Sequence, residues 1–332
     1  MTIEDVFQLI KDDMDRVNSL IQNSLYSEVA LINQISQYII NSGGKRLRPI
    51  LVLLSANAFS YRSRELQGKG GNSEKDVTLA AVIEFIHTAT LLHDDVVDES
   101  ELRRGKDTAN ELWGNAASVL VGDFLYSRAF EMMVGVDSMK VMEIISHSTN
   151  TIAEGEVLQL LNCNDASTTE QRYLEVIHFK TAKLFESASQ LGAVIAGQDE
   201  ATEQAMARFG MHLGTAFQLI DDVLDYSASS DDMGKNVGDD LAEGKPTLPL
   251  IYAMKHGTAE QAETIKEAIE QGGLDQIEAI SQAIHATGAL DYTHEIARQE
   301  AQQAIAQLEK IPDSEYKQAL ITLANFSVER TY

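Results

Sequence analysis

The sequence predicts an all-α fold, and three observations support that prediction. The chain has 332 residues and only 4 prolines, and proline is the residue that most strongly interrupts a helix. Straight-chain residues and alanine, which favour helices, are abundant. Apolar residues recur at helical spacing, whereas no segment alternates apolar and polar residues as a strand would. We therefore expect one all-α domain that spans residues 1–332.

The first expected helices lie on either side of a glycine turn. Apolar positions at helical spacing indicate helix over residues 4–40. The chain then breaks at Gly43-Gly44, and Pro49 fits the first turn of the next helix, where its missing N–H leaves no hydrogen bond unmade. Residues 60–76 are polar and glycine-rich. We expect them to form an exposed loop and not a domain linker, because helical periodicity resumes at once.

Two apolar helical stripes each lead into an acidic motif of the form DDxxD. The first motif is Asp94-Asp95-Val96-Val97-Asp98, and the second is Asp221-Asp222-Val223-Leu224-Asp225. In each motif the outer aspartates are four residues apart, so they share one helix face and repel each other. They also lie near a helix C-terminus, where the helix dipole disfavours anions. A divalent cation resolves both conflicts, because carboxylate and phosphate oxygens are the ligands that Mg²⁺ prefers.

A single acidic motif could equally be a solvated helix end, since the chain has a net charge of −25. Two copies favour a functional site. Two such helices side by side would face six carboxylates across one cleft, and burial of that much unpaired charge is too costly. Each nearby basic residue alone would be ordinary surface charge, but together they suit an anionic ligand; they are Lys45, Arg46, Arg48, Arg103, Arg104, Lys235 and Lys245.

The acidic composition and the single cysteine disfavour several classes of protein. A nucleic-acid-binding protein needs a basic face, and an anionic membrane surface would repel this chain. No run approaches the roughly 20 apolar residues that span a bilayer, and the acidic N-terminus lacks an apolar signal core. Cys163 has no cysteine partner for an intrachain disulfide. We therefore expect a cytoplasmic protein without a nucleic-acid partner or stable membrane insertion.

Five blocks of sequence, in order along the chain, resemble the trans-prenyl diphosphate synthases of isoprenoid biosynthesis, also called polyprenyl synthases. They are GGKRLRP (43–49), FIHTATLLHDDVVDESELRRGKDTAN (85–110), NAASVLVGDFLYSRAF (115–130), FKTAKLFESA (179–188) and FQLIDDVLDY with GKNVGDDLAEGKPTLPL (217–250). The resemblance implies a single-domain isoprenoid-synthase helical bundle around a central elongation cavity. It also implies a homodimer and a magnesium-dependent enzyme with three Mg²⁺ ions in each active site.

Roles for individual residues are implied by the resemblance, motif by motif. The magnesium ligands would be Asp94, Asp98, Asp221 and Asp225. Isopentenyl diphosphate would be bound by Lys45, Arg48, His87 and Arg104, and the allylic diphosphate by Arg103, Lys180 and Lys235. Carbocation stabilisation at the allylic carbon would come from Thr181 and Gln218. The residues alone leave His87 equally open to a role as a hydrogen-bonded core histidine, although it lies two helical turns before Asp94 on the same face.

The resemblance implies a prenyltransferase that ionises an allylic diphosphate, condenses it with isopentenyl diphosphate and eliminates a proton. The growing chain would pass Ala89 and Thr90, about one turn before the first acidic motif, where short-chain synthases carry bulky aromatics. Small residues there favour a long product. We predict octaprenyl diphosphate (C40), made from farnesyl diphosphate for the side chain of a quinone such as ubiquinone. The floor of the tunnel would be formed by Phe85, Ile86, Met132 and Met133.

Four other interpretations stay open. A terpene cyclase also uses DDxxD and Mg²⁺, but it would not need the GGKRLRP block for a second diphosphate. A non-catalytic subunit of a heteromeric synthase tends to lose its acidic motifs, and both are intact here. A calcium-binding module would need the looped ligand spacing of an EF-hand. A trans-prenyl synthase with another product length fits the same motifs.

Overall fold

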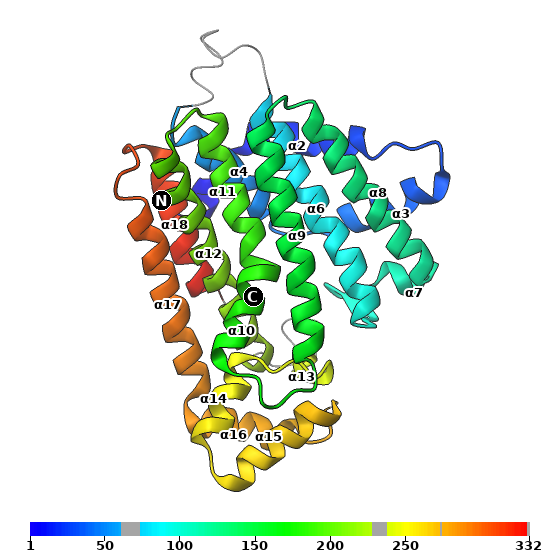
Figure 1. Ribbon diagram of the computed structural model, residues 1–332, viewed down its shortest axis with the longest axis vertical. Coiled ribbons are helices and arrows are strands. Elements are labelled where there is room, and N and C mark those ends of the chain that lie inside the picture. The colour runs from blue at the N-terminus through cyan, green and yellow to red at the C-terminus, as the bar shows by residue number, and fades with distance from the viewer. Residues whose placement is uncertain (61–73, 228–237, 273, 331–332) are drawn as a thin grey trace. The chain divides into compact units, whose positions relative to one another are not determined.

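The computed structural model describes residues 1–60, 74–227, 238–272 and 274–330, and it confirms the all-α prediction (Figure 1). The chain divides into two compact units. Unit 1 comprises Met1–Thr149, Leu184–Arg208 and Leu308–Thr322, and unit 2 comprises Asn150–Lys183, Phe209–Gln307 and Leu323–Tyr332. Several helices continue from one unit into the other, so the units are not successive halves of the chain. The single domain 1–332 stays a prediction.

Unit 1 is built around one long buried helix, α6 (Lys75–Val97). Leu79, Ala80 and Phe85 point in different directions around this helix, and all three are fully buried. A helix that is apolar on all sides must be surrounded by other elements. Its neighbours are α2 (Lys11–Ser24), α4 (Leu47–Asn57), α7 (Ala109–Trp113) and α8 (Asn115–Val134) (Figure 1). Unit 1 also contains α1 (Ile3–Leu9), α3 (Ala30–Ile40), nearly all of α11 (Lys183–Ile195), and the first parts of α9 (Met139–Asn162), α12 (Glu200–Ser227) and α18 (Glu315–Glu329).

The segment predicted as helix over residues 4–40 consists of three helices. The break between the second and the third has a local cause, because the Asn33 side chain binds the backbone of Ser27 in both directions. Its Oδ1 accepts from the Ser27 N–H at 2.9 Å, and its Nδ2 donates to the Ser27 carbonyl at 2.7 Å. Such side-chain bonds offer the backbone an alternative to continued helix.

The predicted loop at residues 60–76 is too long at its C-terminal end. Lys75 and Asp76 belong to α6, and Asp76 is fully buried. An acidic residue in the first helical turn is favoured by the helix dipole, and the Asp76 carboxylate accepts from the Val77 N–H at 2.9 Å. Residues 61–73 lie outside the described residues.

A short β-hairpin follows the first acidic motif, although no strand was expected from the sequence. Strands β1 (Leu102–Arg103) and β2 (Lys106–Asp107) pair in antiparallel fashion. Arg104 and Gly105 connect them with φ angles of 54° and 71°. Positive φ at both central positions defines the two-residue turn that best matches the twist of a hairpin. The hairpin fixes the backbone positions of Arg103 and Arg104.

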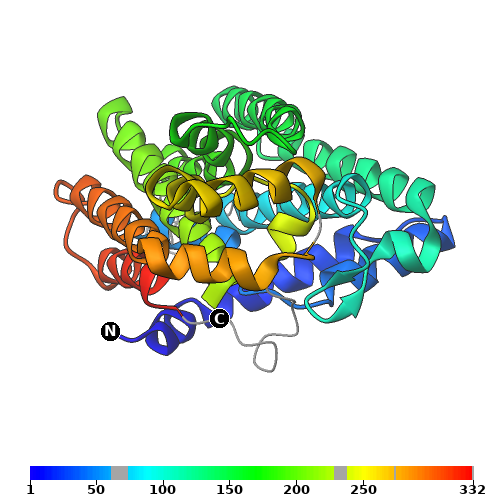
Figure 2. The same ribbon diagram turned by 90° about the horizontal axis from the view of Figure 1, so that it is seen from below.

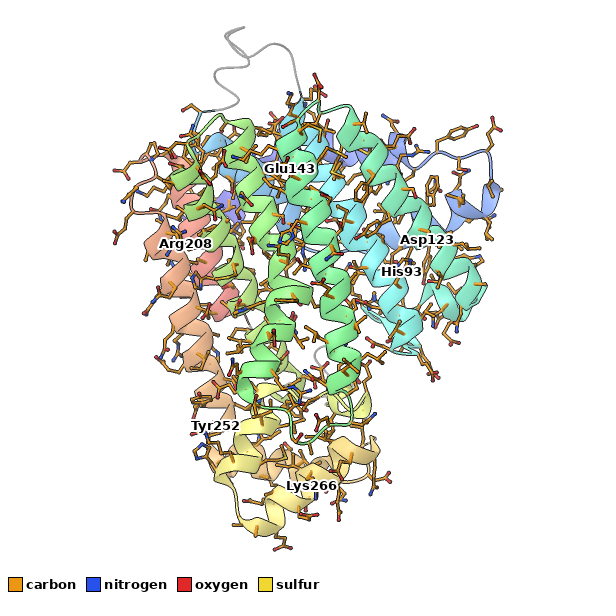
Figure 3. The ribbon with its side chains drawn as sticks, in the orientation of Figure 1. His93, Asp123, Glu143, Arg208, Tyr252 and Lys266 are labelled. Atoms are coloured by element: carbon orange, nitrogen blue, oxygen red, sulfur yellow. The ribbon has the colours of Figure 1, made fainter. Side chains whose placement is uncertain are left out.

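Unit 2 gathers around α14 (Leu248–His256), which contacts α10 (Glu170–Val176), α15 (Ala259–Gln271), α16 (Ile277–Thr287) and α17 (Ala289–Gln307). Figure 2 shows α15 and α16 side by side. Tyr252 of α14 stacks on the rings of His256 and Tyr292, with centroids 4.2 Å apart in both pairs (Figure 3). The unit also contains a π-helical segment, η1 (Ile177–Ala182), and the short helix α13 (Asp239–Ala242). No helix in the described ranges combines the length and the apolarity needed to cross a bilayer.

Candidate active site

The first acidic motif forms the C-terminal end of α6. Asp94 and Asp98 are half-buried, and the Asp98 N–H closes the last helical turn on the Asp94 carbonyl at 2.8 Å. His93 anchors this end of α6 to α8, because its Nε2 lies 3.1 Å from the Val119 carbonyl and 3.4 Å from Asp123 Oδ1 (Figure 3). The motif is therefore held on a packed helix and not on a mobile loop.

Asp95, the middle aspartate of the first motif, is fully buried and binds Arg103. Its Oδ1 lies 2.6 Å from Arg103 Nε and 2.5 Å from Arg103 Nη2. Burial raises the pKa of Asp95, and the Arg103 guanidinium opposes that rise. The family resemblance implied that Arg103 binds the diphosphate, and it implied no role for Asp95. The structure shows that Asp95 holds Arg103 in place.

Arg48 and His87, both predicted to bind isopentenyl diphosphate, contact each other within unit 1. Arg48 Nη1 lies 3.1 Å from His87 Nε2, and a guanidinium can only donate. His87 Nε2 must therefore accept, which places the ring proton on Nδ1. Burial, reinforced by nearby arginines, lowers the pKa of His87 well below its usual value. His87 is thus a neutral ring that orients Arg48, whose guanidinium also lies 4.4 Å from the centroid of the Phe185 ring.

Arg104 reaches from the hairpin back to the glycine turn. Its Nη1 donates to the Gly43 carbonyl. Gly44 has a φ of 134°, and a Cβ there would lie 2.7 Å from Arg104 Nη1. The backbone conformation favours glycine at this position, and a side chain there would displace the Arg104 guanidinium. The half-buried Lys45 follows directly, so the turn brings together the two parts of the predicted set that are far apart in sequence.

The second acidic motif belongs to α12 in unit 2, and its aspartates have different partners. Asp221 Oδ1 lies 2.7 Å from Arg330 Nη2. Asp222, the middle aspartate, is buried and accepts from the Tyr173 hydroxyl and from Gln218 Nε2, the latter at 2.9 Å. Burial raises the pKa of Asp222 well above its usual value, and the charge of Asp240 adds to the rise.

Asp225, the last aspartate of the second motif, contacts the start of α13. Its carboxylate accepts from the backbone N–H groups of Asp239 and Asp240, at 3.1 and 3.4 Å. A carboxylate at a helix N-terminus satisfies donors that have no partner within the helix. Lys235, predicted to bind the allylic diphosphate, lies outside the described residues.

Lys180 and Thr181 lie on the π-helical segment η1, which the sequence did not indicate. Lys180 Nζ lies 2.6 Å from Glu156 Oε2, and Thr181 Oγ1 donates to Gln218 Oε1 at 3.2 Å. The structure thus brings together Thr181 and Gln218, the two residues assigned to the carbocation. Single π-helical turns occur often at functional sites, since the extra residue changes the direction of side chains. A π-turn disturbs the helical periodicity too little to be recognised in the sequence.

The six predicted tunnel residues are part of the core of unit 1. Fully buried are Phe85, Ile86, Ala89 and Met133, and half-buried are Thr90 and Met132. Four of the six lie on α6 and the two methionines lie on α8, and these two helices are in contact. Thr90 Oγ1 donates to the His87 carbonyl at 2.8 Å. Their role in setting the product length stays a prediction.

The donor atoms suit a metal that binds together with its substrate. Among the residues that the structure describes, no three His, Cys, Asp or Glu side chains gather closely enough to hold a metal by themselves. Mg²⁺ is usually held by one or two carboxylates, by water and by substrate phosphates. Asp94 and Asp98 lie one turn apart and are partly accessible, so they fit that mode of binding.

Comparison with known proteins identifies the family. The family model described as Polyprenyl synthetase matches residues 29–287. The chain belongs to this family. Octaprenyl diphosphate synthase of Escherichia coli (strain K12) is 54% identical over 331 residues, which cover 99% of both chains. An all-trans-nonaprenyl-diphosphate synthase (geranyl-diphosphate specific) of Rhodobacter capsulatus is 45% identical over 98% of both chains.

A solved structure supports the same assignment. The polyprenyl synthase of Caulobacter crescentus CB15, crystallised with calcium and isoprenyl diphosphate, has a TM-score of 0.92 and 44% identity, and the match covers 100% of this chain and 98% of that one. The predicted isoprenoid-synthase fold is confirmed. The prediction of a trans-prenyltransferase that makes long products is confirmed as well.

Proposed function

We propose that the chain adds isopentenyl diphosphate units successively to farnesyl diphosphate and releases all-trans-octaprenyl diphosphate (C40), a quinone side-chain precursor. The observation that carries this proposal is the 54% identity to an octaprenyl diphosphate synthase, which extends over 99% of both chains. Two local arrangements support it: Arg103 held beside the first acidic motif, and Thr181 bound to Gln218 one turn before the second. In our proposal the first arrangement serves the diphosphate and the second serves the carbon that ionises.

The metal ligands in this proposal are the four outer aspartates, Asp94, Asp98, Asp221 and Asp225, with three Mg²⁺ ions per active site. When bound, Mg²⁺ supplies positive charge to the leaving diphosphate oxygens. A divalent metal fits the calcium in the related crystal structure, and the choice of Mg²⁺ rests on the preference of that ion for carboxylate and phosphate oxygens.

The chain's own side chains bind and orient the two substrates. Arg103 and Lys180, together with Lys235, bind the allylic diphosphate, and its C–O bond breaks with the electron pair leaving on diphosphate. The oxygens of Thr181 and Gln218 stabilise the resulting allylic cation. The double bond of isopentenyl diphosphate, bound by Lys45, Arg48, His87 and Arg104, attacks this cation. The product then loses a proton to the departed diphosphate, which restores an allylic diphosphate for the next cycle.

A homodimer is part of the proposal, and α9 offers a surface for it. Val157, Leu160 and Leu161 are 57%, 62% and 66% exposed, and their spacing places them on one face of the helix. An apolar face of this kind suits a second copy of the chain. We further propose that the enzyme acts in the cytoplasm.

The proposal is tested by incubating the purified chain with farnesyl diphosphate, isopentenyl diphosphate and Mg²⁺. Mass analysis of the dephosphorylated product should show C40 as the main species, and a chelator should abolish its formation. A main product of C45 or C50 would refute the proposed length. No elongation by the chain alone would favour a non-catalytic subunit.

A further inference from the structure

Glu84 is a carboxylate in unit 1 to which the roles above assign nothing. It lies on α6, one turn before His87, and its side chain is 12% exposed. Its Oε1 lies 3.3 Å from Arg46 Nη1. Burial raises the pKa of Glu84, whereas the charges of Arg46, Arg48 and Arg104 lower it. Glu84 therefore contacts Arg46 directly, and the charges of Arg48 and Arg104 also act on it.

Two of these arginines come from irregular backbone. Arg46 precedes α4 with a φ of 48°, in the left-handed region that non-glycine residues rarely adopt. Its Nη2 donates to the Ile40 carbonyl at 3.1 Å. Arg104 occupies the hairpin turn and donates to the Gly43 carbonyl. Backbone carbonyls orient both groups but carry no net charge to offset the repulsion between them.

Two uncharged groups contact the third arginine. Arg48 donates to the neutral His87 ring and lies over the face of Phe185. Like charges within one site repel, and the neutral His87 ring does not offset that repulsion. Glu84 is the carboxylate whose charge acts on all three arginines.

We propose that Glu84 is a positioning residue, whose carboxylate keeps Arg46, Arg48 and Arg104 assembled as a preformed site for the diphosphate of isopentenyl diphosphate. This inference rests on the proposed function, and it adds to the predicted set both Glu84 and Arg46. Positive charge stays in excess, since three guanidinium groups face one carboxylate. A preformed site binds more tightly, because the ordering cost is met before the ligand arrives.

Loss of the Glu84 charge has two opposite effects on diphosphate binding. Which effect is larger shows whether Glu84 positions the arginines or only offsets their charge. Without the carboxylate the site is more positive, which would tighten the binding of any diphosphate. Without it the arginines also lose their shared partner, which would weaken binding, because guanidinium–phosphate pairs depend on geometry. Our proposal requires the second effect to dominate.

The test uses Glu84→Gln in the full-length chain, which keeps the size of the side chain and removes its charge. We expect KM for isopentenyl diphosphate to rise about tenfold, while kcat at saturation and KM for farnesyl diphosphate change less than about twofold. Calorimetric titration with isopentenyl diphosphate alone, which has no reaction partner, should show a Kd weakened by a similar factor. An unchanged or lower KM and Kd for isopentenyl diphosphate would overturn the proposal.

Three further variants keep the test decisive. Glu84→Asp retains the charge one methylene further back, so it should raise KM for isopentenyl diphosphate by about threefold; if Glu84→Gln fails to fold, an unchanged KM in this variant overturns the proposal. In an Arg46→Gln background, Glu84→Gln should have a smaller effect than in the wild type, because the two residues act together.

Glu111→Gln, at an exposed position on α7, is the matched control and should change neither KM nor Kd for isopentenyl diphosphate. If the wild type itself neither binds isopentenyl diphosphate nor elongates, the proposed function fails instead.

Discussion

The two acidic motifs share the DDxxD pattern, but their middle aspartates have different hydrogen-bond partners. Asp95 pairs with a full charge, the Arg103 guanidinium, at 2.5–2.6 Å. Asp222 accepts from neutral donors, the Tyr173 hydroxyl and the Gln218 amide. Burial raises the pKa of both carboxyls, and only in the first motif does an arginine beside the group oppose the rise.

The difference shows that a DDxxD motif contains two kinds of aspartate. Residues i and i+4 share a helix face, whereas residue i+1 lies about 100° away and here points into the core. The middle aspartates are therefore internal anchors. Asp95 fixes a cation proposed to bind diphosphate, and Asp222 fixes Gln218, proposed to face the carbocation. The outer aspartates are the residues proposed to hold metal.

The largest effect should come from an outer aspartate of the first motif. Asp94→Ala should lower turnover by at least about 100-fold, as expected for loss of a metal that stabilises transition-state charge. Its unfolding midpoint should stay close to the wild-type value, because the substitution relieves the repulsion between Asp94 and Asp98. Steady-state kinetics and thermal denaturation measure both. Gross unfolding of the variant would point to a structural role.

The middle aspartates should differ in how much free energy of unfolding they contribute. Asp95→Asn loses hydrogen bonds to a charged group and should cost about 2 kcal/mol, whereas Asp222→Asn loses bonds to neutral donors and should cost about 1 kcal/mol. Denaturant titration of both variants measures the difference. Asp95→Asn should in addition raise KM for the allylic substrate, because Arg103 loses its anchor.

Equal costs for the two variants would remove the distinction between a charged and a neutral anchor. Arg103→Met provides the control for Asp95→Asn. If the pair acts as a unit, the double variant should lose less stability than the sum of the two single variants.

The residues four and five positions before each motif offer a second comparison, and it concerns product length. The first motif is preceded by Ala89-Thr90, and the second by Ala216-Phe217. Ala89→Phe or Thr90→Phe should shorten the main product, because a ring would enter the proposed tunnel. Ala89 is fully buried, so its substitution should also cost about 1–3 kcal/mol by overpacking, while the half-buried Thr90 should tolerate the ring better. Unchanged product length in both variants would refute the assignment of Ala89 and Thr90 to the tunnel.

Much of the site could be predicted because it depends on spacing along single helices. The i, i+4 spacing singled out the outer aspartates, and the family blocks singled out Thr181 and Gln218, which are in contact. The anchors could not be predicted in this way. Tyr173 lies 49 positions before its partner Asp222, so only tertiary structure brings them together.

Other features left a signal in the sequence that could have been used. Glu84 is an isolated charge within an apolar helical stripe, and such a residue needs a buried partner. Arg104-Gly105 has the glycine expected at the second position of a hairpin turn. The π-helical segment left none, because one extra residue per turn barely changes the apolar pattern.

The smallest effect we predict concerns Arg330, which distinguishes the outer aspartates of the two motifs. Arg330 pairs with Asp221, donates to the Phe217 carbonyl at 2.6 Å and lies 3.7 Å from the centroid of the Phe217 ring. Arg330→Met keeps an apolar stem on the ring but removes the charge. We expect a loss of less than about 1 kcal/mol in unfolding free energy, below the usual range for hydrogen bonds to charged groups, because Asp221 is 42% exposed and water screens the pair.

Arg330→Lys separates the two contributions of the arginine, since it keeps the charge and loses the planar fork and its stacking. It should retain part of the stability that Arg330→Met loses. Diphosphate and Mg²⁺ together should stabilise the chain, and a thermal-shift titration gives the Mg²⁺ concentration at which this stabilisation is half-maximal. If Arg330 also orients Asp221 for metal, both variants should raise that concentration. The Asp222→Asn variant, which leaves the Arg330 pair intact, should shift it less. An equal shift in all three would mean that the two aspartates cannot be separated into anchor and ligand.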